Sequence, residues 1–159
     1  QARRDGAVAP AVIALCAVIA VSAVPLFLAS RYRDRAVEQA PAAPLAALSD
    51  LDRAQALDPL SPRPSTEEGL VALRLGQRAR AVAAFEEALD RNADGWLPHL
   101  MLGLLAAREG DERAARAHLD AAGRLNPRER VVAKARTDVQ AGRAADPLDI
   151  AAMVLRERE

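Results

Sequence analysis

The stretch Trp96–Pro127, WLPHLMLGLLAAREGDERAARAHLDAAGRLNP, decides the fold because the chain carries a related copy of it 34 residues earlier. Nine residue pairs are identical at that shift: Gly69/Gly103, Leu70/Leu104, Ala72/Ala106, Arg74/Arg108, Gly76/Gly110, Ala81/Ala115, Ala83/Ala117, Ala88/Ala122 and Asn92/Asn126. A fixed period of this length with small residues at constant offsets is typical of a stack of helical hairpins.

The residue types at these offsets predict how two helices pair in each copy. Gly and Ala allow close approach of two helices, and a large residue, Phe85 or Leu119, fills the space between them. Gly76 and Gly110 follow the first helix of each pair, where a positive φ ends a helix. The periodicity therefore predicts helices over 65–75, 78–91, 96–109 and 112–125.

The same residues resemble the tetratricopeptide repeat. The resemblance rests on Leu102-Gly103, Gly110-Asp111, Ala115, Leu119, Ala122 and Pro127, with Gly69, Gly76, Ala81, Phe85 and Ala88 in the earlier copy. It implies an all-α solenoid of helical hairpins whose first helices line a groove for a partner.

The rest of the chain extends this pattern. Residues 44–59 match the second helix of an earlier, degenerate unit, whose first helix must come from the 28–40 region. Ser65 with Glu68 forms a possible capping box, and Asp146-Pro147 starts a last helix. The predicted organisation is a flank (1–6), a transmembrane helix (7–30), three hairpin units (31–61, 62–95 and 96–129) and C-terminal capping helices (130–159).

The uncharged run Gly6–Ser30 predicts a membrane span. Its 25 residues would extend about 37 Å as a helix, against a hydrocarbon core of about 30 Å. Three arginines after the run against two before it weakly favour the cytoplasm for the repeats. The abundance of Ala and Arg suggests a bacterial genome, so the predicted location is a bacterial inner membrane. A cleaved signal peptide is the alternative. We expect the span and the helix to about Ala40 to form one continuous element.

No residue pattern predicts catalysis, a cofactor or a metal site. The only histidines, His99 and His118, fall on different predicted helices without nearby cysteines, so we interpret them as surface or packing residues. Lysine and arginine together number 22, as do the acidic residues, so nothing indicates a nucleic-acid partner. The sequence predicts a protein that is not an enzyme by itself.

The predicted function is therefore protein binding. By the resemblance, a partner-binding groove would be lined by Arg63, Thr66, Leu70, Leu73 and Arg74 in one copy and by Leu97, Leu100, Leu104, Ala107 and Arg108 in the other. The alternative is that Leu97, Leu100 and Leu104 pack on the C-terminal helices.

Across its whole length the chain also resembles the C-terminal part of bacterial O-antigen ligase or polymerase-like membrane proteins. The phrases ALDPLSPRP, HLMLGLLAAREGD and GRAADPLDI carry this resemblance. It implies a regulatory or scaffolding tail that contacts neighbouring domains of its own complex and the bilayer through 7–30. The family's catalysis belongs to a membrane body that these residues do not include. An independent assembly factor of the cytochrome c biogenesis type is the alternative.

Overall fold

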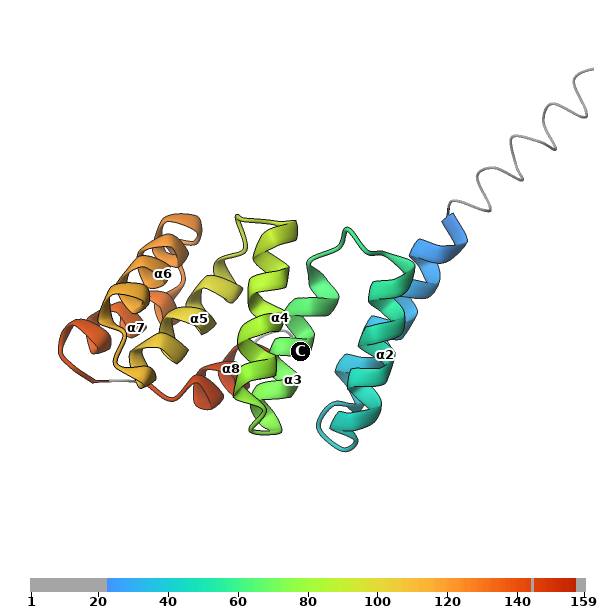
Figure 1. The fold of residues 1–159 in the computed structure, drawn as a ribbon, viewed down its shortest axis with the longest axis horizontal. Coiled ribbons are helices and arrows are strands. Elements are labelled where there is room, and N and C mark those ends of the chain that lie inside the picture. The colour runs from blue at the N-terminus through green and yellow to red at the C-terminus, as the bar shows by residue number, and fades with distance from the viewer. Residues whose placement is uncertain (1–22, 144, 157–159) are drawn as a thin grey trace, which may run out of the picture.

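A computed structural model describes residues 23–143 and 145–156, and every regular element in these ranges is a helix (Figure 1). The first helix covers residues 23–39. It is followed by α2 (Pro44–Leu57), α3 (Arg63–Arg74), α4 (Arg78–Arg91), α5 (Trp96–Glu109), α6 (Glu112–Leu125), α7 (Arg130–Gln140) and α8 (Pro147–Arg156). The prediction of an all-α fold is confirmed.

Consecutive helices pair into hairpins that stack in chain order. Helix 23–39 pairs with α2, α3 with α4, and α5 with α6, and each hairpin contacts the next (Figure 1). The second helices begin at Pro44, Arg78 and Glu112 and each has 14 residues. The 34-residue period of the sequence is thus the spacing of successive hairpins in a solenoid-like stack.

Glycines bring the two helices of a hairpin together at the places that the repeat predicts. A Cβ atom on Gly69 would lie 2.6 Å from Cζ of Phe85, and one on Gly103 would lie 2.7 Å from Cγ of Leu119. Gly76 and Gly110 adopt φ of 70° and 79° at the turns between the paired helices. The residue after each turn glycine donates its backbone N–H to a carbonyl of the preceding helix; Gln77 N, for example, donates to Ala72 O at 2.9 Å.

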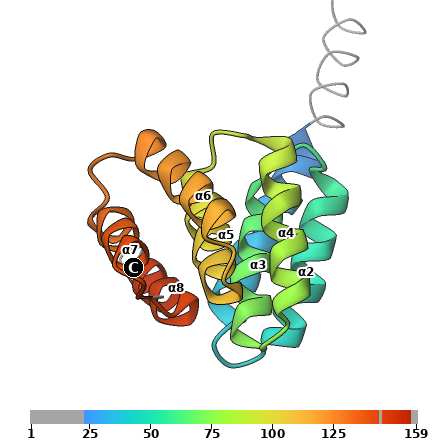
Figure 2. The same ribbon diagram turned by 60° about the vertical axis from the view of Figure 1, so that its left-hand side comes forward.

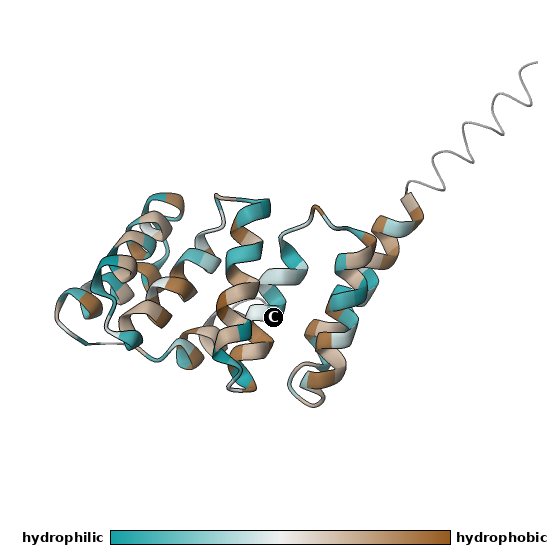
Figure 3. Cartoon of the chain, in the orientation of Figure 1, coloured by the Kyte–Doolittle hydropathy of each residue, from teal (hydrophilic) through white to brown (hydrophobic). Residues whose placement is uncertain are grey.

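Two hydrophobic clusters hold the stack together. The larger one joins the two central hairpins to α7 and α8, and Phe85, Leu100, Met101 and Leu104 are fully buried in it. The smaller one joins helix 23–39, α2 and Val71 of α3. Hydrophilic and hydrophobic residues alternate along α4 and α6, as expected for helices with one buried face (Figure 3).

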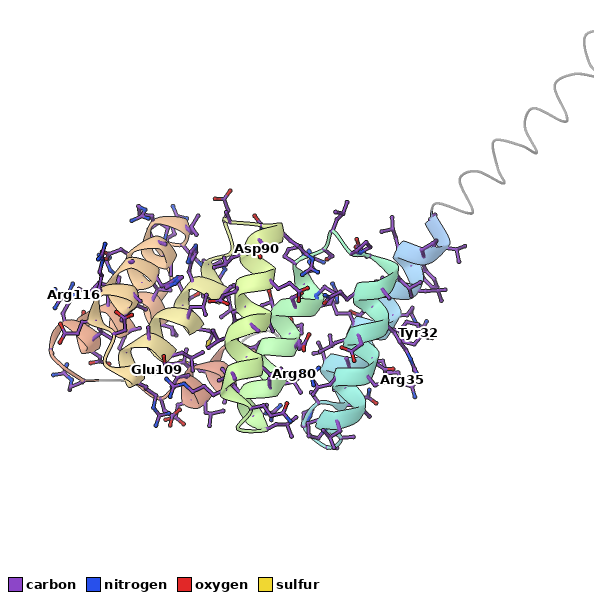
Figure 4. All side chains as sticks on the ribbon, viewed as in Figure 1. Tyr32, Arg35, Arg80, Asp90, Glu109 and Arg116 are labelled. Atoms are coloured by element: carbon purple, nitrogen blue, oxygen red, sulfur yellow. The ribbon has the colours of Figure 1, made fainter. Side chains whose placement is uncertain are left out.

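Polar contacts add to the first hairpin. The buried carboxylate of Asp50 accepts a hydrogen bond from Gln39 Nε2 at 2.7 Å and lies 3.2 Å from Arg53 Nη1 and 3.5 Å from Arg35 Nε. Figure 4 shows Arg35 and Tyr32 at this end of the stack, and the Arg53 guanidinium lies 5.7 Å from the Tyr32 ring centroid. Burial of Asp50 is tolerated because these donors replace its hydration.

Three predictions about the elements need correction. Ser65 does not cap a helix: α3 begins at Arg63, with Pro64 in its first turn, so Ser65 lies inside the helix and is buried. Its hydroxyl instead contacts Gln55, Glu87 and Arg91 of the flanking helices.

The last helix does not simply cover the end of the stack. Helix α7 packs on α6, but α8 turns back and packs on α3 and α5 (Figure 2). Its start is as predicted, because Asp146 Oδ1 accepts a hydrogen bond from Leu148 N at 2.9 Å.

The predicted membrane span is the third correction. Within the described residues, no helix combines the length and the apolar character that crossing a membrane requires. The prediction of a span over 7–30, and with it the inner-membrane location, is therefore not supported; residues 7–22 of that stretch lie outside the described residues. The described part, 23–39, is one unbroken helix, as expected for the element that continues to about Ala40.

Candidate functional site

The candidate site lies on the face formed by helix 23–39, α3 and α5, which we call the first-helix face. Positions 63, 66, 70 and 74 of α3 share one side of that helix, as do positions 97, 100, 104 and 108 of α5. The sequence places the predicted groove residues along these two stripes. The structure does not bring them together in one groove.

The five leucines of the predicted groove belong to the core. Leu70, Leu73, Leu97, Leu100 and Leu104 are each at most 5% exposed and form part of the larger hydrophobic cluster. A side chain this deeply buried presents almost no surface to a partner. Their burial does not favour a partner groove at these five positions and agrees with the alternative that Leu97, Leu100 and Leu104 pack within the fold.

The N-terminal ends of the stripes line an open hollow of about 730 Å³. Helix 23–39 supplies one wall, the starts of α3 and α5 supply the others, and the α4–α5 connection closes one end. The lining residues are Arg33, Asp34, Val37, Glu38, Pro62, Arg63, Thr66, Glu67, Ala88, Asn92, Gly95, Trp96, Leu97 and Pro98. Of the predicted groove residues, Arg63, Thr66 and Leu97 are among this lining.

The hollow combines apolar surface with charge. Val37 is 41% exposed, and Trp96 is half-buried beside it in the lining. Arg63 is exposed, and within the described part of the chain no hydrogen bond or ion pair involves its guanidinium. Arg33, by contrast, is paired with Asp34 at 2.5 Å. Arg63 is thus an exposed cation of the hollow, whose lining also includes Glu38 and Glu67.

The C-terminal ends of the stripes meet the chain's own α8. Arg108 Nη1 lies 3.1 Å from Asp146 Oδ1 at the start of α8. Ile150 and Ala151 of α8 are buried in the same cluster as the α3 and α5 leucines, and Pro147 is also fully buried. One half of the first-helix face therefore already holds a short helix, with an acidic residue at its N-terminus bound by an arginine.

The two remaining groove residues lie outside the hollow. Arg74, which corresponds to Arg108 one period earlier, is exposed and has no ion-pair partner among the residues that the structure describes. Ala107 is half-buried near the end of α5.

The structure also brings together two residues that sequence reasoning kept apart. His99 of α5 and His118 of α6 face each other across the hairpin, with 2.9 Å between their Nδ1 atoms. Their ring centroids are 5.2 Å apart and the ring planes are tilted by 43°. The turn at Gly110 could have indicated this contact, because folding the two helices back on one another places 99 close to 118.

The environment of this pair lowers the pKa of both imidazoles. Burial is the main cause for each ring, because it disfavours the charged form. The hydrogen bond from His99 to Ala93 O raises the His99 pKa, and the positive charge of Arg124 lowers it further. His99 lowers the His118 pKa, and Glu86 raises it.

Comparisons with known proteins found no match for the chain, either to a protein-family model or to a curated protein. The resemblance to the tetratricopeptide repeat and to O-antigen ligase-like proteins is thereby corrected: no family match supports it, and no membrane-crossing helix is found among the described residues. The stack of helical hairpins itself is observed.

Proposed function

We propose that this protein is a non-catalytic binding module that takes up a short helical segment of a partner protein in the hollow of the first-helix face. The observation that carries the proposal is the docking of α8 on the adjoining half of the same face. A helix laid into a groove between helices is a common mode of peptide recognition, with anchors at helical spacing.

The chemistry of the hollow specifies the partner segment. Val37 and Trp96 offer apolar surface to one or two aliphatic anchors, and Trp is a residue type that often dominates binding energy. Arg63 would bind a carboxylate near the start of the segment, as Arg108 binds Asp146 at the start of α8. The expected ligand is thus a short amphipathic helix with an acidic N-terminal residue.

Site-directed crosslinking tests the proposal. A photo-crosslinking amino acid is placed at Val37 in the hollow and, as control, at Leu60, which is 83% exposed and not part of the lining. The segment joined to position 37 is identified by mass spectrometry and made as a synthetic peptide. The proposal expects a helical segment that crosslinks from position 37 and not from position 60.

Two matched charge reversals on α3 then test the geometry. Arg63→Glu places a negative charge in the hollow, whereas Arg74→Glu makes the same change at the far end of the same helix. Like-charge juxtaposition should weaken peptide binding by at least about 10-fold for Arg63→Glu and leave it unchanged for Arg74→Glu. Equal effects of the two variants, or equal crosslinking from positions 37 and 60, would contradict the proposal.

A further inference from the structure

The contacts of the His99–His118 pair favour one arrangement of protons on the neutral rings. His99 Nε2 lies 3.3 Å from Ala93 O, a contact that requires a proton on Nε2. The His99 Nδ1 atom then carries a free lone pair, and His118 Nδ1–H donates to it across 2.9 Å. Metal-binding histidines are oriented in the same way, with one ring nitrogen donating to a backbone carbonyl and the other left free.

The separation of the rings fits a shared metal ion. Two imidazoles bound to one tetrahedral ion at about 2.05 Å would have Nδ1 atoms about 3.3 Å apart and ring centroids about 5.2 Å apart. The observed centroid separation is 5.2 Å, and the Nδ1 atoms, which lie 2.9 Å apart, would have to separate by about 0.4 Å. Both rings would have to rotate about their Cβ–Cγ bonds for their Nδ1 lone pairs to converge on one ion.

We propose that His99 and His118 form a bidentate zinc-binding site that links α5 to α6. The His118 proton moves from Nδ1 to Nε2, so that both Nδ1 atoms coordinate the ion and no net proton is released from neutral rings. Among the described residues no third His, Cys, Asp or Glu joins this pair in a cluster, so water completes the coordination. Both side chains are only half-buried, which leaves solvent access for the ion.

Neighbouring charges act on such an ion in opposite directions. Arg124, which acts on His99 from α6, opposes a cation at the pair. Glu86, which acts on His118 from α4, favours one. Burial lowers the pKa of both imidazoles, which favours the neutral rings that a metal ion requires.

The test is calorimetric titration of the full chain with zinc chloride at pH 7.5, together with His99→Gln and His118→Gln. Each substitution keeps a polar side chain, and circular dichroism checks that helical content is unchanged. We expect one zinc ion per chain and a loss of affinity above about 10-fold in either variant, since even outer-shell changes reach that size. Arg124→Gln should bind zinc more tightly than the wild type, and Glu86→Gln less tightly.

Nitrogen-15 NMR of the imidazoles provides an independent measurement. Zinc should shift the Nδ1 resonances of both histidines, and the His99 Nε2 resonance should remain that of a protonated nitrogen. Zinc affinity that is equal in the wild type and both histidine variants would place the ion elsewhere on the chain and overturn the proposal. An absence of binding heat at millimolar zinc would overturn it as well.

Discussion

Replacement of Gly69 by alanine tests the packing rule on which the hairpin stack depends. The new Cβ would lie 2.6 Å and 2.7 Å from ring carbons of Phe85, which is fully buried and cannot turn away. Normal contact requires a displacement of about 1 Å, so we expect the upper end of the range for overpacking, about 3 kcal/mol. Alanine regains about 1 kcal/mol through its higher helix propensity. The net loss is about 2 kcal/mol, or a Tm lower by about 4–8 °C.

The assay is urea and thermal unfolding of the full chain, with Gly123→Ala as the matched control. Gly123 also lies inside a helix, but its added Cβ would meet only the flexible end of Arg136, at 3.1 Å. That variant should be as stable as the wild type or more stable by up to about 1 kcal/mol.

A double-mutant cycle isolates the contact itself. Phe85→Leu puts a leucine opposite position 69, as Leu119 lies opposite Gly103 in the next hairpin. This second substitution should restore part of the stability that Gly69→Ala removes. If Gly69→Ala unfolds at the wild-type midpoint, or if the two substitutions are additive, the close approach of α3 and α4 does not depend on this pair.

Three further outcomes are expected. Asp146→Ala should cost about 0.5–2 kcal/mol through loss of the α8 cap and of the Arg108 ion pair, and hydrogen exchange should show faster opening of α8. Ser65→Ala should cost about 1 kcal/mol in urea unfolding, because Ser65 Oγ accepts a 2.7 Å hydrogen bond from Arg91. The hydrogen bond from Arg91 holds the pKa of Glu87 below its ordinary value of 4.5. The ionised Glu87 carboxylate therefore stabilises the fold above that pH, and this stabilisation is lost as the pH falls further. Glu87→Gln should make the unfolding free energy less pH-dependent below about pH 4.5.

The repeat made most of the fold predictable from sequence. Small residues at constant offsets, with Phe85 or Leu119 opposite a glycine, specify local helix pairing, and four predicted helices agree with α3 to α6 within two residues. The capping prediction for Ser65 failed because Pro64 starts the helix earlier, which the capping pattern alone does not reveal.

The site was less predictable because it depends on long-range packing. Helical spacing correctly puts Leu70 and Leu104 on the same stripes as Arg63 and Arg108, but it cannot show that these leucines are buried in the core. The hollow needs helix 23–39 as its third wall, and that helix lies outside the clear repeat. The His99–His118 contact likewise appears only when α5 and α6 are folded against each other.

The fluorescence of Trp96 is the most direct measurement of the central claim. Trp96 is the only tryptophan of the chain and lines the hollow, so a segment bound there must change its surroundings. Titration with the synthetic peptide identified by crosslinking should give a saturable change in Trp96 emission. The midpoint should move to higher peptide concentration for Arg63→Glu and stay in place for Arg74→Glu. Peptide binding that leaves Trp96 emission unchanged, or that responds equally to both charge reversals, would show that the hollow is not the binding site.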